Sequence, residues 1–292
     1  MTIFSFPPIG LGCMSLPVKD EQKSIRLLHH AFDLGLRFLD TADIYDHGMN
    51  ETIIGKAIQN RRSDILLATK VGNQIRHDAS GWAWNPRKEY IIKAVDESLR
   101  RLRTTYIDLY QLHGGTIDDP IDESIEAFEL LKSSGKIRGY GISSIRQNVI
   151  SEYVKRSQIS SVMLQYSLLD RRPEEQLLPL LEENGISVLA RGSLAKGLLV
   201  GKPAAEYLGH SADDVVSATA AVAACSSQKR SPVQTAIRYV LHGRSFVTAV
   251  VGVSNIIQLD EIAGVISTPA LADEEYEILR TSIPAKIYSD HR

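Results

Sequence analysis

Short apolar runs alternate with amphipathic segments along almost the whole chain. The amphipathic segments repeat apolar residues three and four positions apart, as in Ile25, Leu28 and Phe32, which is the spacing of one helix face. The apolar runs are short and nearly continuous, which is typical of strands buried on both faces. The eight predicted strands cover residues 8–12, 37–40, 64–71, 106–113, 136–143, 160–167, 186–191 and 246–254.

Helices are predicted between these strands, with the last ones following the eighth strand. Asp119 and Pro120 are expected to start one helix, with the acid as N-cap and Pro at the first helical position. Another is expected to begin at Pro173. A longer loop is predicted at residues 72–86. The predicted helices cover residues 25–35, 51–58, 91–102, 119–135, 148–155, 173–185, 231–240, a segment from 256, and 273–281.

The alternation of strands and helices favours a parallel sheet, and eight units favour a closed barrel. An open doubly wound sheet is the competing fold, but no G-x-G-x-x-G follows the first strand. We therefore predict one α/β domain over residues 1–292, a (β/α)8 TIM barrel. It would carry an Ala-, Gly- and Ser-rich insertion at about 192–229 and a C-terminal helix and tail at about 273–292.

Composition narrows the function classes. The chain is 43% hydrophobic and 23% charged with a net charge of -2, which disfavours disorder and a nucleic-acid partner. Cys13 and Cys225 are too few for a disulfide framework, so we expect a reduced, cytoplasmic setting. The start, MTIFSFPPIG, lacks the pattern of a signal peptide, and no apolar run approaches the roughly 20 residues that span a bilayer.

Titratable residues stand where three successive predicted strands end. Asp40 follows FL, Lys70 follows ILLAT, and His113 closes YIDLYQLH, while Tyr45 lies in the loop just after Asp40. In a (β/α) barrel the carboxyl ends of all strands face one opening. We therefore expect these four side chains to meet at the mouth of one pocket.

Together the four side chains suit protonation of a substrate oxygen. Taken singly, each has an ordinary interpretation: a cap, an ion-pair partner, a solvated charge or a packing ring. A Tyr hydroxyl has a pKa of about 10 and becomes a useful acid only beside a group that stabilises the phenolate. Lys70 could do so for Tyr45, with Asp40 holding the ammonium and His113 orienting the oxygen. The alternative, a purely structural Asp40–Lys70 ion pair, stays open.

The sequence resembles the aldo-keto reductase superfamily along nearly its whole length. The motifs that carry the resemblance are GLGCMSL, FLDTADIYDHGMNE, LLATKVG, YIDLYQLH, YGISS, LQYSLLDRR and GVSNIIQLDE, in the family's order. It is most similar to the bacterial general-stress-type branch, through LHGGTIDDPIDESIEAFELLKSSGKIRGYGISS and LLDRRPEE. The resemblance implies a TIM barrel that binds NADPH across its C-terminal face and reduces small-molecule carbonyl compounds.

The resemblance also implies roles for individual residues. Tyr45 would be the general acid of a tetrad with Asp40, Lys70 and His113, and Asp40 would also lie beside the cofactor. No metal is expected. The residues implied to bind the cofactor are Gly12, Cys13, Met14, Ser143, Ser144, Gln165, Arg191, Gly192, Ser193, Leu194, Lys196, Gly197, Gly252, Ser254, Gln258 and Glu261.

Substrate contacts are expected from Tyr45 and His113. Trp82 and Trp84 lie in the predicted loop at residues 72–86, where two tryptophans near Lys70 could form the lip of an aromatic pocket. A clamp that fixes the loop is an equally good interpretation of the pair.

The chain departs from the family pattern at three points. Ser144 stands where Asn is frequent, and Arg191 stands where an aromatic residue usually stacks on the nicotinamide. The segment near the expected 2′-phosphate carries the neutral residues Ser254, Asn255 and Gln258 in place of Arg or Lys. A preference for NADPH is expected to be modest, which leaves NADH open as a second cofactor.

Two other functions compete with the reductase. A cofactor-binding regulatory or redox-sensing module would bind NADPH with little turnover, although the complete tetrad argues against it. A barrel isomerase or lyase with Lys70 as a Schiff-base amine would suit Lys70 alone, but leaves Asp40 and Tyr45 unexplained. The oligomeric state does not follow from the sequence.

Overall fold

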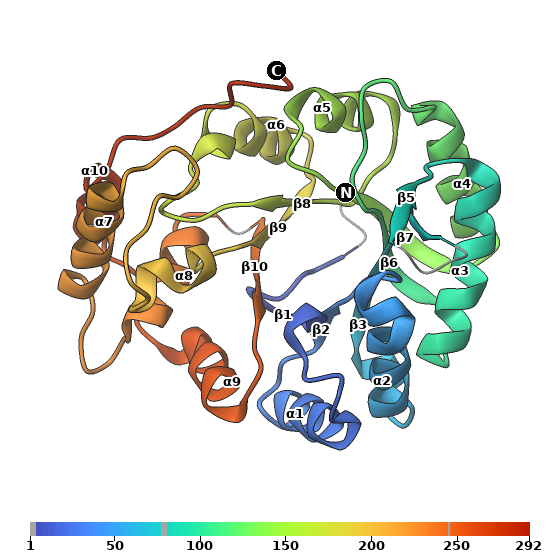
Figure 1. The fold of residues 1–292 in the computed structure, drawn as a ribbon, viewed down its shortest axis with the longest axis horizontal. Helices are drawn as coiled ribbons and strands as arrows, with labels where there is room; N and C mark the ends of the chain where they lie inside the picture. Colours follow the sequence, from blue (N-terminus) through green and yellow to red (C-terminus); the bar gives the residue numbers. More distant parts are fainter. Residues whose placement is uncertain (1–3, 77–80, 245) are drawn as a thin grey trace.

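The computed structural model describes residues 4–76, 81–244 and 246–292, and its centre is a closed barrel of parallel strands (Figure 1). The order around the barrel is β1-β10-β9-β8-β7-β6-β3-β2. This confirms the predicted single-domain (β/α)8 barrel. The barrel strands are β1 (Ile9–Gly12), β2 (Phe38–Asp40), β3 (Leu66–Val71), β6 (Ile107–Leu112), β7 (Ile137–Ser143), β8 (Ser161–Gln165), β9 (Ser187–Arg191) and β10 (Val247–Gly252).

Helices form a ring around the barrel and bury one apolar face against it (Figure 1). In the described ranges, none of them combines the length and the apolar character that a membrane span requires. The α-helices are α1 (Glu21–Asp33), α2 (Met49–Ile58), α3 (Lys88–Leu102), α4 (Ile121–Ser133), α5 (Gln147–Arg156), α6 (Leu177–Glu183), α7 (Ala212–Ala224), α8 (Pro232–Leu241), α9 (Ile256–Ala263) and α10 (Asp273–Thr281).

The barrel interior is filled by a separate apolar cluster. Its members come from six strands and from the segment that precedes β1: Phe4, Phe38, Ala68, Leu109, Met163, Leu189 and Val250. Gly139 of β7 leaves room for the ring of Phe4, because a Cβ at Gly139 would lie 2.5 Å from that ring. Apolar side chains therefore fill the barrel at the amino-terminal ends of its strands. A ligand can enter only from the carboxyl ends.

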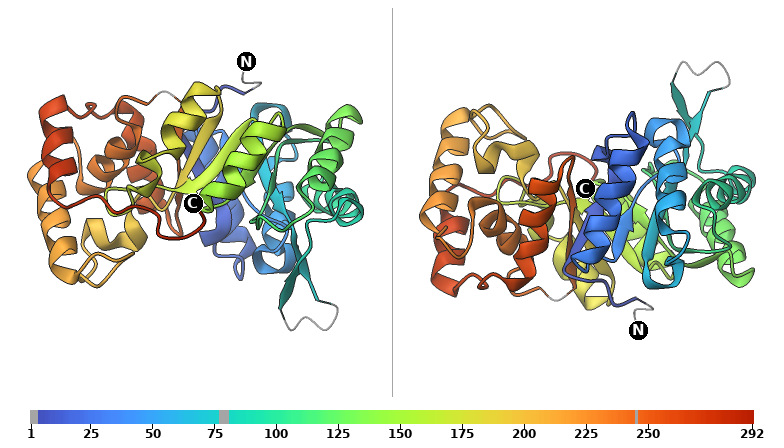
Figure 2. Two further views of the ribbon diagram at one scale, coloured as in Figure 1. Left: turned by 90° about the horizontal axis from the view of Figure 1, so that it is seen from above. Right: turned by 90° about the horizontal axis from the view of Figure 1, so that it is seen from below.

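The loop predicted at residues 72–86 contains a two-stranded antiparallel hairpin, β4 (Asn73–Ile75) and β5 (Trp82–Trp84). Residues 77–80 of that loop lie outside the described residues. The hairpin projects beyond the barrel at the end opposite to the segment that leads into β1 (Figure 2). It therefore stands at the carboxyl end of the strands, where the predicted site lies.

The two helix starts that were predicted from a proline were wrong in detail. The N-cap of α4 is Pro120, without a side-chain cap, because the Asp119 carboxylate instead accepts hydrogen bonds from the backbone N–H of Thr116 and the indole N–H of Trp84. The helix predicted from Pro173 begins as a short 3-10 turn, η4 (Arg172–Glu174), and α6 follows it.

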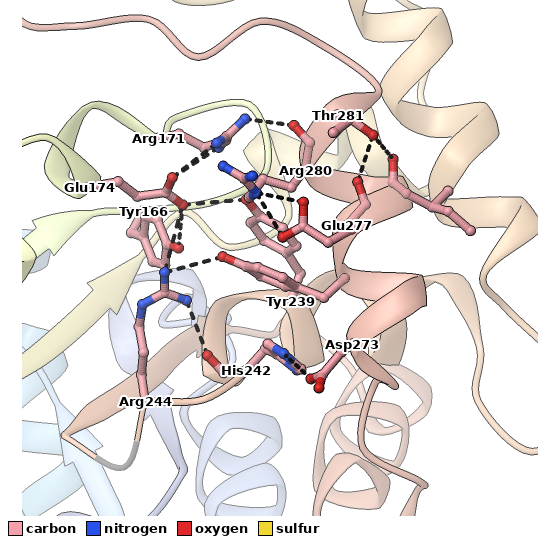
Figure 3. Close-up of polar contacts among 12 residues, drawn as sticks. Tyr166, Arg171, Glu174, Tyr239, His242, Arg244, Asp273, Glu277, Arg280 and Thr281 are labelled. Atoms are coloured by element: carbon pink, nitrogen blue, oxygen red, sulfur yellow. Dashed lines mark hydrogen bonds and ion pairs between the residues drawn. The ribbon is translucent and has the colours of Figure 1, made fainter.

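Glu174 ties the end of the chain to the barrel (Figure 3). Its carboxylate accepts hydrogen bonds from the Tyr166 hydroxyl at 2.8 Å and from Arg171 Nε and Nη2 at 3.1 Å. Arg171 Nη1 in turn donates to the carbonyl oxygen of Arg280, near the end of α10, at 2.7 Å. Since Tyr166 directly follows Gln165 in the chain, this cluster links α10 to the last residues of β8.

Candidate active site

Asp40 and Lys70 form a buried ion pair between the neighbouring strands β2 and β3. Asp40 pairs with Ala68, and Lys70 lies two residues further along the same face of β3. Lys70 Nζ donates to Asp40 Oδ2 at 2.7 Å and to the Thr41 carbonyl oxygen at 2.6 Å. Its third contact is the Tyr45 hydroxyl oxygen, at 3.5 Å. The structure thus places an ammonium group between a carboxylate and a phenol.

Burial and ion pairing have opposing effects on the pKa values of Asp40, Lys70 and Tyr45. Burial raises the pKa of Asp40, against the opposing effect of Lys70. Burial alone would lower the pKa of Lys70, but Asp40 and Tyr45 raise it above its ordinary value, so Lys70 keeps its proton. Burial also raises the pKa of the Tyr45 hydroxyl, while Lys70 opposes the rise. Tyr45 therefore holds a proton that the neighbouring ammonium makes easier to give up.

His113 lies against Tyr45, with ring centroids 5.9 Å apart and an angle of 83° between the ring planes. Burial, together with the charges of Lys70 and Arg191, lowers the pKa of His113 to about 3, so the imidazole is neutral. Its Nδ1 is buried and has no hydrogen-bond partner among the described residues. Buried N–H donors without a partner are rarer in folded proteins than buried acceptors without one, which favours the tautomer with the proton on Nε2.

A cavity of about 620 Å³ opens beside Tyr45. Its walls are mostly apolar or aromatic, with polar groups at Asp46 and His47. Both of these residues have left-handed backbone, with φ of 48° and 54°, which is uncommon for residues other than glycine and often marks a functional site. The lining residues are Met14, Ile44, Tyr45, Asp46, His47, Ile75, Gly81 and Trp82.

The two tryptophans of the hairpin lie in different surroundings. Trp82 is exposed and lines the cavity. Trp84 packs close to Gly72, where a Cβ would lie 2.6 Å from its ring, and its indole N–H donates to both carboxylate oxygens of Asp119 at 2.9 and 3.0 Å. These contacts of Trp84 are those of a loop clamp, and Trp82 has those of a pocket wall.

The first predicted cofactor loop follows β1 directly. Gly12 ends the strand, and the thiol of Cys13 is fully buried, where burial raises its pKa. Met14 is 64% exposed and lines the cavity beside Tyr45. The carbonyl oxygen of Cys13 accepts a hydrogen bond from Asn50 Nδ2 at 2.8 Å. The loop is thus joined to α2.

The residues predicted to hold the carboxamide lie at the ends of adjacent strands. Ser143 ends β7 half-buried, and Ser144 follows it. Gln165 ends β8 opposite Arg191 of β9. Arg191 Nη1 donates to Gln165 Oε1 at 3.0 Å, and Gln165 Nε2 donates to the hydroxyl of Tyr207 at 3.0 Å.

The loop after β9 has unusual backbone. Gly192, Lys196 and Gly197 have φ of 76°, 58° and 92°. Such left-handed residues can turn successive N–H groups toward one side, as in anion-binding loops. Ser193 is buried, and its hydroxyl has no hydrogen-bond partner among the described residues. Leu194 is half-buried, whereas Lys196 is exposed.

The residues predicted at the adenine end lie after β10, at the start of α9. Gly252 ends the strand, and Ser254 contacts Gln258 through its backbone N–H at 2.9 Å and its hydroxyl at 3.1 Å. Glu261 faces α8, where Oε1 accepts the hydroxyl of Ser231 at 2.8 Å. Because β1, β7, β8, β9 and β10 run parallel, all the predicted cofactor segments lie at the same end of the barrel as Tyr45.

Several residues around the tetrad were missed by sequence reasoning. Gln111 Nε2 donates to Asp40 Oδ1 at 3.2 Å, and its position two residues before His113 in one strand was the available signal. Asn50 and Glu51 are fully buried polar residues at the start of α2. Tyr207 comes from the predicted insertion, and no sequence signal linked it to Gln165.

Comparison with known proteins bears on this site. The model of the family described as "Aldo/keto reductase family" matches residues 8–283. The chain is 50% identical over 293 residues to the uncharacterized oxidoreductase YqkF of Bacillus subtilis, covering 97% of this chain and 95% of YqkF.

Solved structures are similar in both sequence and fold. The holo form of aldo-keto reductase AKR11C1 from Bacillus halodurans is 48% identical, with a TM-score of 0.90 over 98% of this chain and 95% of that chain. An aldo-keto reductase from Klebsiella pneumoniae in complex with NADPH is 27% identical, with a TM-score of 0.77 over 98% of this chain and 93% of that chain.

Proposed function

The chain belongs to the aldo/keto reductase family, and we propose that it reduces the carbonyl group of an aldehyde or ketone with NADPH as the reductant. NADPH, when bound, supplies the hydride that the reduction needs. The chain's own residues must then deliver one proton to the carbonyl oxygen and orient the substrate. The observation that carries the proposal is the contact of Lys70 with both Asp40 and Tyr45 at the edge of a cavity.

Tyr45 is the proton donor in this proposal. Its hydroxyl belongs to a residue that lines the cavity, and Lys70 Nζ lies 3.5 Å behind it. As the proton leaves, the phenolate is stabilised by the ammonium group, which Asp40 and the Thr41 carbonyl hold in place. Asp40 contributes through the position of Lys70.

His113 orients the substrate oxygen. Since burial keeps the imidazole neutral and Nδ1 has no partner in the described structure, we assign the proton to Nε2. Nε2–H can then donate to the carbonyl oxygen beside Tyr45. A neutral donor also leaves the general acid role to Tyr45 alone.

The residues at the carboxyl ends of the strands fit a dinucleotide. The buried Ser193 hydroxyl without a partner and the left-handed loop at Lys196 and Gly197 suit phosphate oxygens. Gln165 and Ser144 would hold the carboxamide, and the start of α9 would hold the adenine end. In support, the Klebsiella pneumoniae relative is described in complex with NADPH.

Mass spectrometry of the purified protein, followed by an aldehyde panel, tests the proposal. NADP(H) retained after purification and NADPH oxidation that depends on an added aldehyde are the expected results. Retained cofactor without turnover of any carbonyl compound would favour a cofactor-binding module over an enzyme. Borohydride trapping of a Lys70 adduct would instead indicate Schiff-base chemistry and contradict the proposed role of Lys70.

A further inference from the structure

The first turn of α2 buries two adjacent polar side chains. Asn50 and Glu51 both have a relative exposure of 0%. A buried carboxylate is costly unless it is paired and hydrogen-bonded. The polar atoms of both side chains have hydrogen-bond partners, and each side chain contacts a residue next to the tetrad. Formation of helix α2 alone does not require these contacts, because neither side chain caps the helix.

Asn50 joins two of the loops that carry the site. Its Oδ1 accepts the hydroxyl of Thr41 at 2.7 Å, and its Nδ2 donates to the carbonyl oxygen of Cys13 at 2.8 Å. Thr41 follows Asp40, and its own carbonyl oxygen accepts the ammonium of Lys70 at 2.6 Å. One side chain thus holds an acceptor of Lys70 and the predicted cofactor loop in a fixed relation.

Glu51 makes a similar side-chain contact to β3, the strand that carries Lys70. Oε1 accepts the hydroxyl of Thr69 at 2.6 Å, and Oε2 accepts Arg101 Nε of α3 at 2.7 Å. Thr69 immediately precedes Lys70 in β3. Glu51 therefore fixes the strand at the residue from which the ammonium projects, and Arg101 supplies the opposite charge.

We propose that Asn50 and Glu51 are positioning residues that hold Asp40, Lys70 and the Cys13 loop in their reactive arrangement; this rests on the proposed reductase function. A fully satisfied buried polar network has few alternative arrangements, so it specifies one position of α2 against β2 and β3. Asn50 acts through Thr41 and the Cys13 carbonyl, and Glu51 acts through Thr69. A displacement of about 1 Å in such an arrangement can lower a rate by up to 10²-fold.

The test removes the threonine hydroxyls and leaves side chains of similar shape. Thr41→Val deletes the donor to Asn50, and Thr69→Val deletes the donor to Glu51. Thr41→Ser and Thr69→Ser keep the hydroxyls and serve as conservative rescues. The matched control is Thr248→Val, because Thr248 is also buried in a barrel strand and its hydroxyl donates to the Pro7 carbonyl at 2.9 Å, away from the tetrad.

We expect each Val variant of Thr41 and Thr69 to lower kcat on the order of tenfold, with KM for NADPH within about twofold. Both Ser variants should recover most of the rate. The melting temperature of Thr248→Val should fall by about as much as those of the Thr41 and Thr69 Val variants, but its kcat should stay unchanged. Wild-type kcat in both Val variants, or an equal loss of kcat in Thr248→Val, would show a structural role only and overturn the proposal.

Crystal structures separate this inference from the proposed function. The distance from Lys70 Nζ to Asp40 Oδ2 should stay at 2.7 Å in wild type and in Thr248→Val. In the double variant Thr41→Val/Thr69→Val it should exceed hydrogen-bond range, about 3.2 Å. If the wild type reduces no carbonyl compound, the proposed function fails, and the distances still decide the positioning claim. An unchanged distance in the double variant would contradict it.

Discussion

Arg191 donates a hydrogen bond of 3.0 Å to the side-chain oxygen of Gln165, its partner in the neighbouring strand. The guanidinium charge acts on the site, because it contributes to the lowered pKa of His113, although less than burial and Lys70 do. From the resemblance to the family we expect Arg191 to stand where an aromatic residue usually stacks on the nicotinamide. A planar guanidinium can lie flat on a ring as well.

We therefore predict that Arg191 weakens binding of the oxidised cofactor. Reduced nicotinamide is neutral and oxidised nicotinamide is positive. Two unit charges about 4 Å apart repel by roughly 4 kcal/mol at an effective dielectric of 20, so a third of that gives about a tenfold effect. Arg191→Tyr should tighten NADP⁺ relative to NADPH, and Arg191→Lys should keep the wild-type ratio. A parallel loss of both affinities in Arg191→Tyr would mark Arg191 as a phosphate ligand.

Lys70→Met should lower kcat by about 10²–10⁴-fold, because the phenolate of Tyr45 loses its stabilising charge. Asp40→Asn should be milder, since the Thr41 carbonyl still holds the ammonium. Rates and melting temperatures must be measured together on both variants. If both lose stability while the folded fraction keeps its rate, the pair is structural.

Asp43 predicts a pH dependence of stability. It is 7% exposed, and its Oδ1 has no partner in the described ranges. Burial and the charge of Glu51, against the opposing charge of Arg101, raise the pKa of Asp43 to about 8. The charged or titratable groups that act on it or face it are Glu51 of α2, Arg101 and Tyr90 of α3, Lys70 of β3 and Tyr110 of β6.

The folded state therefore binds a proton that the unfolded chain, with an Asp pKa of about 3.9, has released. Because the unfolded state binds fewer protons across this window, stability falls as pH rises from about 4 to 8, by up to about 1.4 kcal/mol per pH unit. Asp43→Asn lacks this loss, so its stability relative to wild type should grow between pH 5 and pH 8. Urea unfolding at several pH values measures the difference, and a constant difference would contradict the assignment.

The preference for NADPH over NADH should be modest. Ser254 and Gln258 are neutral, and neutral donors contribute less to a 2′-phosphate than charged ones. We expect NADPH to bind more tightly than NADH, with the exposed Lys196 of the loop after β9 as a candidate charge. Dissociation constants of both cofactors for wild type and Lys196→Met check this. Equal constants for NADH and NADPH in wild type would remove the preference.

The barrel could be predicted because its strands are apolar on both faces and its helices are amphipathic. The hairpin of Trp82 and Trp84 was missed, because each of its strands has only three residues and lies outside the core. The helix α7 was missed because its Ala-rich sequence has little contrast between its faces. Its start is marked by a capping box of Ser211 and Asp214, a local signal that could have been read.

Residues at strand ends could be brought together from the sequence, since parallel topology places all carboxyl ends at one opening. That argument reached Asp40, Lys70 and His113. It did not reach Asn50, whose partners depend on how α2 packs, or Tyr207, which meets Gln165 from 42 positions away in the chain. Contacts of this kind depend on tertiary packing and leave no periodic pattern.

Replacement of Tyr45 by Phe tests the central claim most directly. The ring and its packing against His113 are kept, and only the hydroxyl beside Lys70 is lost. Stopped-flow rates with an aldehyde found in the panel, and fluorescence titration of NADPH, measure the two consequences. The account predicts that kcat falls by about 10²–10⁴-fold while the dissociation constant of NADPH changes less than about twofold. A Tyr45→Phe variant that reduces the aldehyde at nearly the wild-type rate would contradict it.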